Sequence, residues 1–153
     1  MAILLTAPTA PKIADSCQFQ LDGWIDTAPF EDLLGMTIES CGAGEAVLSM
    51  PFEVRLAQGG GVLHGGALTA LADTAVAIAI KTLLPPGTTF ATTILTTRFL
   101  APVHQGRVRV RAVVTGPQGR SFTGTALVVD AADNPVAEFS AEFRVARGQG
   151  FEE

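Results

Sequence analysis

The sequence predicts an α+β fold in which an antiparallel sheet packs against one long helix. One apolar segment of helical spacing begins at Gly65, and Pro85-Pro86-Gly87 follows it, a combination that ends a helix. The segments before and after it read as strands, about six in all, in the order of a meander. Strands that are grouped around one helix, rather than alternating with helices, favour an antiparallel sheet with the helix on one face.

Length and composition indicate one domain with a large buried surface. The chain has 153 residues, of which 48% are hydrophobic and 16% are charged, and this length is sufficient for a single core. We expect residues 1–27 to form an N-terminal arm, residues 28–147 the folded domain and residues 148–153 a C-terminal tail. Such high hydrophobicity in a small protein also indicates a subunit interface.

Charge and cysteine content argue against several functional classes. The net charge of −5 does not suit a nucleic-acid partner, which would need a basic face. Two isolated cysteines and two histidines offer little to a zinc site, so no metal is expected. The N-terminus lacks the basic region and long apolar run of a signal peptide. A membrane-spanning helix would place Asp73 near the bilayer centre, so we expect a cytoplasmic protein without a membrane partner.

Before the long helix, the chain is predicted to form a short amphipathic segment and a hairpin. The segment Pro29–Leu34 is stopped by Gly35. Two strands follow at Met36–Ser40 and Glu45–Met50, joined through a glycine-bearing turn. A loop that contains three successive glycines then leads into the helix.

After the helix, four strands are predicted, separated by turns rich in Gly, Pro, Asn and Asp. They are Thr88–Leu100, Arg107–Val114, Ser121–Asp130 and Val136–Val145. The second of them alternates Arg with Val, the period-two pattern of a strand with one solvated face. We expect these arginines to pair across strands with acidic residues such as Glu138 or Glu142.

The long helix is apolar on nearly every side and carries one carboxylate near its middle. The predicted core face consists of Leu68, Leu71, Ala75, Ile78 and Thr82. The opposite face is scarcely more polar and consists of Thr69, Asp73, Val76 and Ile80. Such a helix is expected to be covered by the sheet on one side and by another subunit on the other. A partly buried Asp73 needs a hydrogen-bond or ionic partner. The helix sequence alone is equally consistent with a structural role and with a functional role for this carboxylate.

The start of the helix, His64-Gly65-Gly66, presents backbone N–H groups at the positive end of the helix dipole. An oxyanion could bind there, although the glycines would also allow a tight turn into the helix. Gly65 and Asp73 are eight residues apart, roughly 12 Å along a helix, so they cannot act on one carbonyl within one chain. An active site built from both would be shared between antiparallel helices of a two-fold dimer.

Several short motifs together resemble a known family. They are Gln58-x-x-Gly61-x-x-His64-Gly65-Gly66 with Asp73, then Thr97-x-Phe99-Leu100-x-Pro102, and Gly119-Arg120-Ser121. Over about residues 28–146 the chain resembles the hotdog-fold acyl-CoA thioesterases. It is most similar to the PaaI-like branch, which includes phenylacetyl-CoA and 4-hydroxybenzoyl-CoA thioesterases. The resemblance implies a sheet wrapped around a central helix, and homodimers, often paired into homotetramers, with active sites across the dimer interface.

The resemblance also implies roles for individual residues. Asp73 would be the catalytic carboxylate, as nucleophile or as base for water, and the Gly65 N–H would polarise the thioester carbonyl. His64 would help to hold that loop. Gln58 lies where the family places an amide side chain near the thioester or the water, and Thr92 lies near where some members carry a water-orienting hydroxyl.

Substrate contacts follow from the same resemblance. Gly66 and Thr74 adjoin the two catalytic positions, and the turn at Arg120 and Ser121, with Arg98, matches where several members meet the nucleotide end of coenzyme A. The implied reaction hydrolyses an aryl- or short- to medium-chain acyl-CoA to the free acid and CoA. It needs no cofactor beyond the CoA of the substrate.

Two other functions belong to different classes. A non-catalytic acyl-CoA-binding hotdog module would bind the same ligand without turnover, and a buried ion pair at Asp73 away from any cleft would favour it. A hotdog dehydratase or hydratase would need a histidine and a nearby acid arranged for proton abstraction, and the sequence around His64 does not resemble that arrangement.

Overall fold

The computed structural model describes residues 19–152, so most of the predicted N-terminal arm lies outside the described residues. The elements follow the predicted order with small changes at their ends. They are α1 (Pro29–Leu34), β1 (Thr37–Gly42), β2 (Glu45–Pro51), the short 3₁₀ helix η1 (Val54–Leu56), α2 (Gly65–Lys81), β3 (Phe90–Phe99), β4 (Arg107–Gln118), β5 (Ser121–Val129) and β6 (Pro135–Val145).

One antiparallel sheet contains all six strands, in the order β1-β2-β4-β5-β6-β3. The predicted meander is therefore wrong at one strand, because β3 lies at the far edge beside β6 rather than between β2 and β4. The reason is the helix between β2 and β3. Its 17 residues carry the chain roughly 25 Å along the inner face of the sheet, so that β3 begins at the opposite edge.

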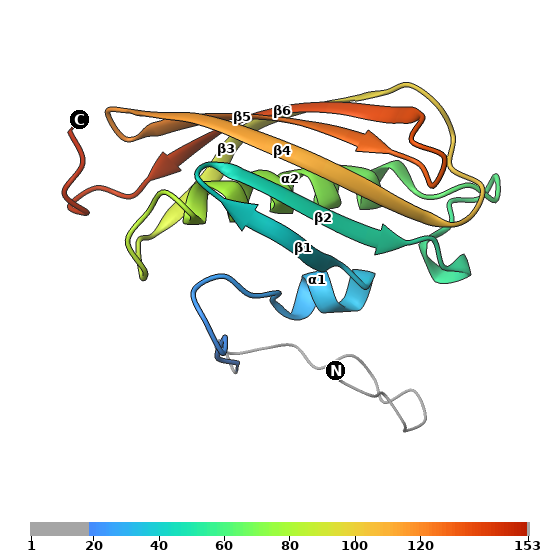
Figure 1. The fold of residues 1–153 in the computed structure, drawn as a ribbon, viewed down its shortest axis with the longest axis horizontal. Coiled ribbons are helices and arrows are strands. Elements are labelled where there is room, and N and C mark those ends of the chain that lie inside the picture. The colour runs from blue at the N-terminus through green and yellow to red at the C-terminus, as the bar shows by residue number, and fades with distance from the viewer. Residues whose placement is uncertain (1–18, 153) are drawn as a thin grey trace.

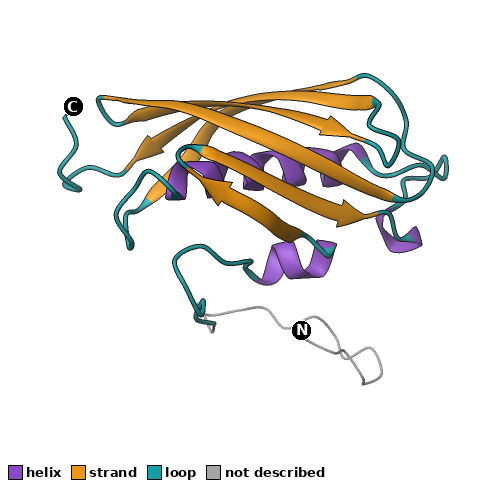
Figure 2. Cartoon of the chain, in the orientation of Figure 1, coloured by secondary structure: helices purple, strands orange, loops and turns teal. Residues whose placement is uncertain are grey.

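The sheet curves over α2, and the core lies between them (Figures 1 and 2). The inward side chains of β2, β4, β5 and β6 alternate with outward ones, as a strand with one solvated face requires. Fully buried examples are Leu48, Val110, Phe122 and Phe143. α1 contacts α2, and its Phe30 remains 55% exposed.

The buried face of α2 is wider than predicted. Val76 and Ile80, assigned from the sequence to the face of Asp73, are completely buried, because a curved sheet covers more of the helix circumference than a flat one. The half-exposed stripe is narrower and consists of Thr69, Ala70, Asp73, Thr74, Ala77 and Lys81.

α2 approaches the sheet closely at Gly124 of β5. A Cβ atom at this glycine would lie 2.2 Å from Cγ1 of Val76, far inside van der Waals contact. Only glycine allows the strand and the helix to approach this closely. This contact holds the middle of α2, and with it Asp73, at a fixed height under the sheet.

No helix within residues 19–152 is both long and apolar enough to cross a membrane.

Candidate active site

Asp73 is half-buried in the middle of α2 and hydrogen-bonded to β3. The Thr92 hydroxyl donates to its Oδ1 at 2.9 Å. Burial raises the pKa of the Asp73 carboxyl, the Thr92 hydrogen bond opposes that rise, and the negative charge of Glu31 adds to it. The carboxylate is thus oriented by one donor and has no ion-pair partner among the described residues.

A bulge in β3 is what points Thr92 at the helix. The Thr97 hydroxyl shares a hydrogen bond of 2.8 Å with Thr69 of α2, so Thr97 also faces the helix. Positions 92 and 97 differ by an odd number and would face opposite sides of a regular strand. The pairing of β3 with β6 is irregular between Thr92 and Ile94, which places one extra residue, Thr93, between two segments of opposite phase.

Glu31 of α1 is the site residue that sequence reasoning missed. Its Oε2 accepts a hydrogen bond from the Ala28 N–H at 3.1 Å, and its Oε1 accepts a longer one of 3.4 Å from the Thr74 hydroxyl. This arrangement holds a second carboxylate near Asp73. The only sequence signal was an acidic residue in the first turn of a short helix, which is common for reasons of capping alone.

At the start of α2, His64 occupies the N-cap position and its Nδ1 accepts a hydrogen bond of 2.8 Å from the Gly66 N–H. The Gly66 N–H is therefore engaged within the chain. In the described part of the molecule, the Gly65 N–H has no acceptor. A Cβ at Gly65 would lie 2.9 Å from the Phe99 ring, so a side chain there would displace the ring.

Gln58 lies in the loop before α2 and is exposed, and its Oε1 accepts a hydrogen bond from the Gly60 N–H. It lines a cavity of about 350 Å³ together with Gly65, Leu68 and Phe99. The structure thus brings Gln58 and Gly65 together at one end of the helix. Asp73 and Thr92 lie together farther along it, and within one chain the two pairs do not meet.

The residues matched to the nucleotide end of coenzyme A do not cluster within one chain. Arg98 lies opposite Glu138 of β6 and forms an exposed ion pair of 3.6 Å with it. Ser121 lies opposite Arg144, six residues farther along β6, which is roughly 20 Å away in a strand. The expectation that Arg98 lies near this turn is therefore wrong for a single chain.

Arg120 is partly buried beside Ser121. Its Nη1 donates to the Val145 carbonyl at 2.9 Å, and the Val145 N–H donates to the Arg120 carbonyl at the same distance. The side chain thus ties the β5 end of the hairpin to the last residue of β6.

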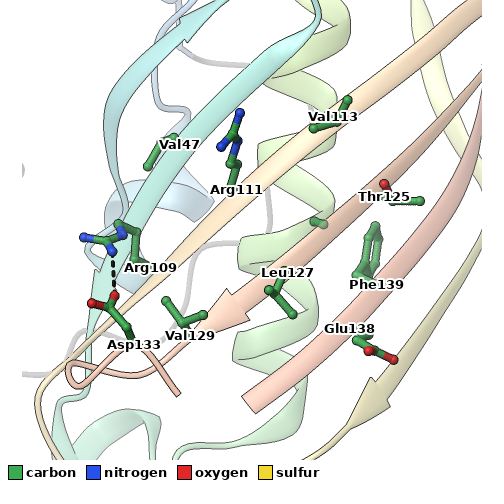
Figure 3. Close-up of a pocket in the computed structure, with 11 residues that line it drawn as sticks. Val47, Arg109, Arg111, Val113, Thr125, Leu127, Val129, Asp133, Glu138 and Phe139 are labelled. Atoms are coloured by element: carbon green, nitrogen blue, oxygen red, sulfur yellow. Dashed lines mark hydrogen bonds and ion pairs between the residues drawn. The ribbon is translucent and has the colours of Figure 1, made fainter. Parts of the chain in front are cut away.

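One cavity lies on the outer face of the sheet, away from α2 (Figure 3). It has a volume of about 660 Å³, and its walls include Val113, Leu127 and Val129. Arg109 pairs here with Asp133 at 2.6 Å, and Arg111 of β4 pairs with Glu45 at 2.9 Å.

The predicted ion pairing of these arginines is correct in kind but wrong in partner, because β5 separates β4 from Glu138 and Glu142 on β6. Both arginines of the outer cavity are paired with carboxylates, and none of the residues that were assigned a catalytic role from the sequence lines it. Those residues lie on the helix side of the sheet or in the loop before α2.

Comparison with known proteins shows which family this chain belongs to. The family model described as the thioesterase superfamily matches residues 60–137. A conserved protein of Pseudomonas aeruginosa is similar in structure, with a TM-score of 0.76, 28% sequence identity, and coverage of 80% of this chain and 97% of that one. This agreement confirms the predicted hotdog architecture.

Two further solved structures are named as PaaI proteins. A variant of the phenylacetic acid degradation protein PaaI of Thermus thermophilus has a TM-score of 0.70 and 30% identity, covering 76% of this chain and 98% of its own. The PaaI protein from the phenylacetic acid degradation operon of E. coli has a TM-score of 0.72 and 27% identity, with coverage of 80% and 87%. The resemblance to this group that the motifs indicated is confirmed.

Proposed function

This chain belongs to the thioesterase superfamily and is a thioester hydrolase, and from that premise we propose that it hydrolyses an aryl- or short- to medium-chain acyl-CoA to the free acid and CoA. The observation that carries the proposal is the half-buried Asp73, oriented by the Thr92 hydroxyl at 2.9 Å. A carboxylate with a raised pKa and no ion-pair partner among residues 19–152 is suited to chemistry rather than to stabilising the fold.

The proposed reaction needs only groups of the protein and water. As a base, Asp73 takes a proton from water while the water oxygen bonds to the thioester carbonyl carbon. As a nucleophile, its carboxylate oxygen bonds to that carbon instead, and water later hydrolyses the mixed anhydride. In both routes the carbonyl oxygen becomes negative and accepts the Gly65 N–H, the C–S bond breaks, and CoA leaves as a thiolate that is protonated by solvent.

We place each site across two subunits. Gly65 and Asp73 are separated by roughly 12 Å along α2, so one chain cannot present both to the same carbonyl. β3 is a free edge of the sheet and bears the exposed apolar residues Ile94 and Leu95, and such an edge favours pairing with another chain. Antiparallel pairing of two β3 strands would set the two α2 helices side by side in opposite directions, with Gly65 of one near Asp73 of the other.

The first experiment measures free thiol released from phenylacetyl-, hydroxybenzoyl- and straight-chain acyl-CoAs by the wild type and by Asp73→Asn. We expect at least one substrate to be hydrolysed and the variant to lose about a hundredfold or more in kcat/KM. Tight binding of a thioester without turnover by the wild type would support the acyl-CoA-binding module instead.

A mixing experiment tests the shared site. Asp73→Asn and Gly65→Ala are each expected to be inactive, the latter because the new Cβ meets the Phe99 ring at 2.9 Å. After the two variants are unfolded and refolded together, half of the dimers are heterodimers in which one of two sites is intact, so about one quarter of wild-type activity should return. No recovery, with heterodimers shown to be present by a size tag on one variant, would contradict a shared site.

We further propose that two dimers associate through the outer face of the sheet. Val113 and Leu127 are each 41% exposed there, in the apolar cavity of about 660 Å³, and a second sheet would cover them. Leu127→Asp should convert tetramers to dimers in analytical ultracentrifugation and retain thioesterase activity, with Thr123→Asp on the same strand as a control outside the cavity. A tetramer that survives Leu127→Asp would refute this arrangement.

A further inference from the structure

A second cavity on the helix side opens at the C-terminal end of α2. It has a volume of about 470 Å³, and its lining includes Ala77 and Lys81 of α2, Phe90 and Thr92 of β3, Phe143 of β6, and Trp24 from the segment before α1. Most of these walls are apolar. Lys81 is the one charged residue in the lining.

Thr92 links this cavity to the carboxylate of Asp73. Thr92 both lines the cavity and donates its hydroxyl to Asp73. Asp73, Ala77 and Lys81 follow one another at intervals of four residues, so their side chains lie on one stripe of the helix. Ala77, with only a methyl group, leaves space one turn beyond the carboxylate, and Lys81 follows one turn later.

Lys81 is held by an aromatic ring rather than by an acid. Its ammonium lies 5.0 Å from the centroid of the Trp24 ring, within the range of a cation–π interaction. The Trp24 indole N–H donates to the Lys81 carbonyl at 3.0 Å, which fixes the ring against the end of the helix. Among the described residues, no carboxylate forms an ion pair with Lys81.

We propose that this cavity is the acyl pocket and that Lys81 binds a carboxylate at the far end of the acyl group, so that the preferred substrates are ω-carboxyacyl thioesters. The inference rests on the proposed thioesterase function and specifies its substrate. A half-buried ammonium at the end of an apolar cavity favours an anion that can form a charge-assisted hydrogen bond with it. The apolar walls suit the methylene groups between the two ends.

The spacing along the helix limits the length of this acyl group. Asp73 and Lys81 are two turns apart, roughly 12 Å. A reacting carbonyl carbon lies about 3.5 Å from the group that attacks it, and a carboxylate lies about 2.8 Å from an ammonium. About 6 Å of this spacing remains, which an extended acyl chain of five or six carbons spans at ordinary bond lengths. Adipyl-CoA, with six carbons, is therefore the test substrate.

The decisive comparison is between adipyl-CoA and its ω-methyl ester, which keeps the length and removes the charge. We expect the wild type to favour adipyl-CoA by about tenfold or more in kcat/KM. Lys81→Met should lose that preference, so that the ratio of kcat/KM for the two substrates approaches one, because only the charged substrate gains from the ammonium. Lys81→Arg should recover part of the preference, and Arg144→Met, which removes an exposed arginine of β6, should leave it unchanged.

Coenzyme A also carries phosphates, which Lys81 could bind instead of an acyl carboxylate. The comparison of adipyl-CoA with its methyl ester distinguishes these two possible ligands of Lys81. If Lys81 bound the nucleotide, Lys81→Met would weaken both substrates equally and would raise the Kd of free CoA, which would overturn the proposal. Equal wild-type activity on the two substrates would overturn it as well.

A binding measurement keeps this inference distinguishable from the proposed reaction. Isothermal titration calorimetry of wild type with adipate should show binding that is about tenfold weaker in Lys81→Met, whether or not any thioester is hydrolysed. Activity on neutral acyl-CoAs without adipate binding would leave the thioesterase function standing and refute the acyl pocket. Adipate binding without thioesterase activity would refute the proposed reaction alone.

Discussion

The hydrogen bond from Thr92 to Asp73 can be tested by removing the hydroxyl while keeping the shape of the side chain. Thr92→Val does this, and Thr92→Ser keeps the hydroxyl as a matched control. The hydroxyl donates to the charged form of Asp73 at 2.9 Å and so lowers the pKa of that carboxyl. In the valine variant the pKa rises further, and a higher pH is needed to ionise the carboxylate.

The expected size follows from the type of hydrogen bond. A hydrogen bond to a charged group contributes about 1.5–3 kcal/mol, and half-burial of Asp73 places this one at the lower end of that range. About 1.4 kcal/mol corresponds to tenfold. We therefore expect Thr92→Val to lose about tenfold in kcat/KM on the acid side of the pH–rate profile.

The assay is kcat/KM for thiol release from pH 5 to pH 9 for the wild type and both variants. The valine variant should recover toward wild-type activity as pH rises, and the serine variant should follow the wild type throughout. An equal loss at every pH would mean that the hydroxyl orients a water or the substrate without stabilising the charged carboxylate. Wild-type behaviour of the valine variant would refute the reasoning altogether.

Three further changes test the surroundings of the site. The pKa of Asp73 is raised in the fold, so its ionisation lowers the stability of the folded state, and this loss grows as pH rises through the acidic range. By differential scanning calorimetry, Asp73→Asn should therefore melt at or above the wild-type temperature at pH 8, and the difference should vanish at acid pH. A lower melting temperature of the variant at pH 8 would contradict this. Glu31→Gln removes a charge that raises that pKa, so the acid limb of the pH–rate profile should move to lower pH, while Asp32→Asn leaves it in place; an unmoved limb would exclude Glu31. Gly124→Ala places a Cβ 2.2 Å from Val76 and should lower the free energy of unfolding in urea by about 1–3 kcal/mol, partly restored by adding Val76→Ala; additive losses would show that the two sites are uncoupled.

The sequence predicted each element because each has a local signal. The alternation of Arg with Val marked β4, and Pro85 marked the end of α2 within a few residues. The neighbours of a strand have no such signal. The position of β3 in the sheet was predicted wrongly because it depends on which edge of the sheet lies at the end of α2. That is a property of the whole fold.

The candidate site was predictable where its residues have a local signal in the sequence. Asp73 and Gly65 stand out within one helix, and helix geometry alone shows that they are too far apart to act together in one chain. The role of Thr92 came from resemblance, since nothing local to β3 reveals its bulge. Glu31 was not predicted, because it reaches α2 from a segment that is 43 residues away from its partner Thr74 in the chain.

The bulge at Thr93 divides β3 into two segments with separate mutational constraints. The segment before it directs Thr92 to the carboxylate, and the segment after it directs Thr97 and Phe99 to the first half of the helix. A substitution in either segment leaves the phase of the other intact. Deletion of Thr93 would remove the bulge and leave one regular strand, in which Thr92 and the shifted Thr97 are an even number of residues apart and still share a face. The first segment also lines the cavity beside Lys81, so substitutions there would change the shape of that cavity without moving Thr97.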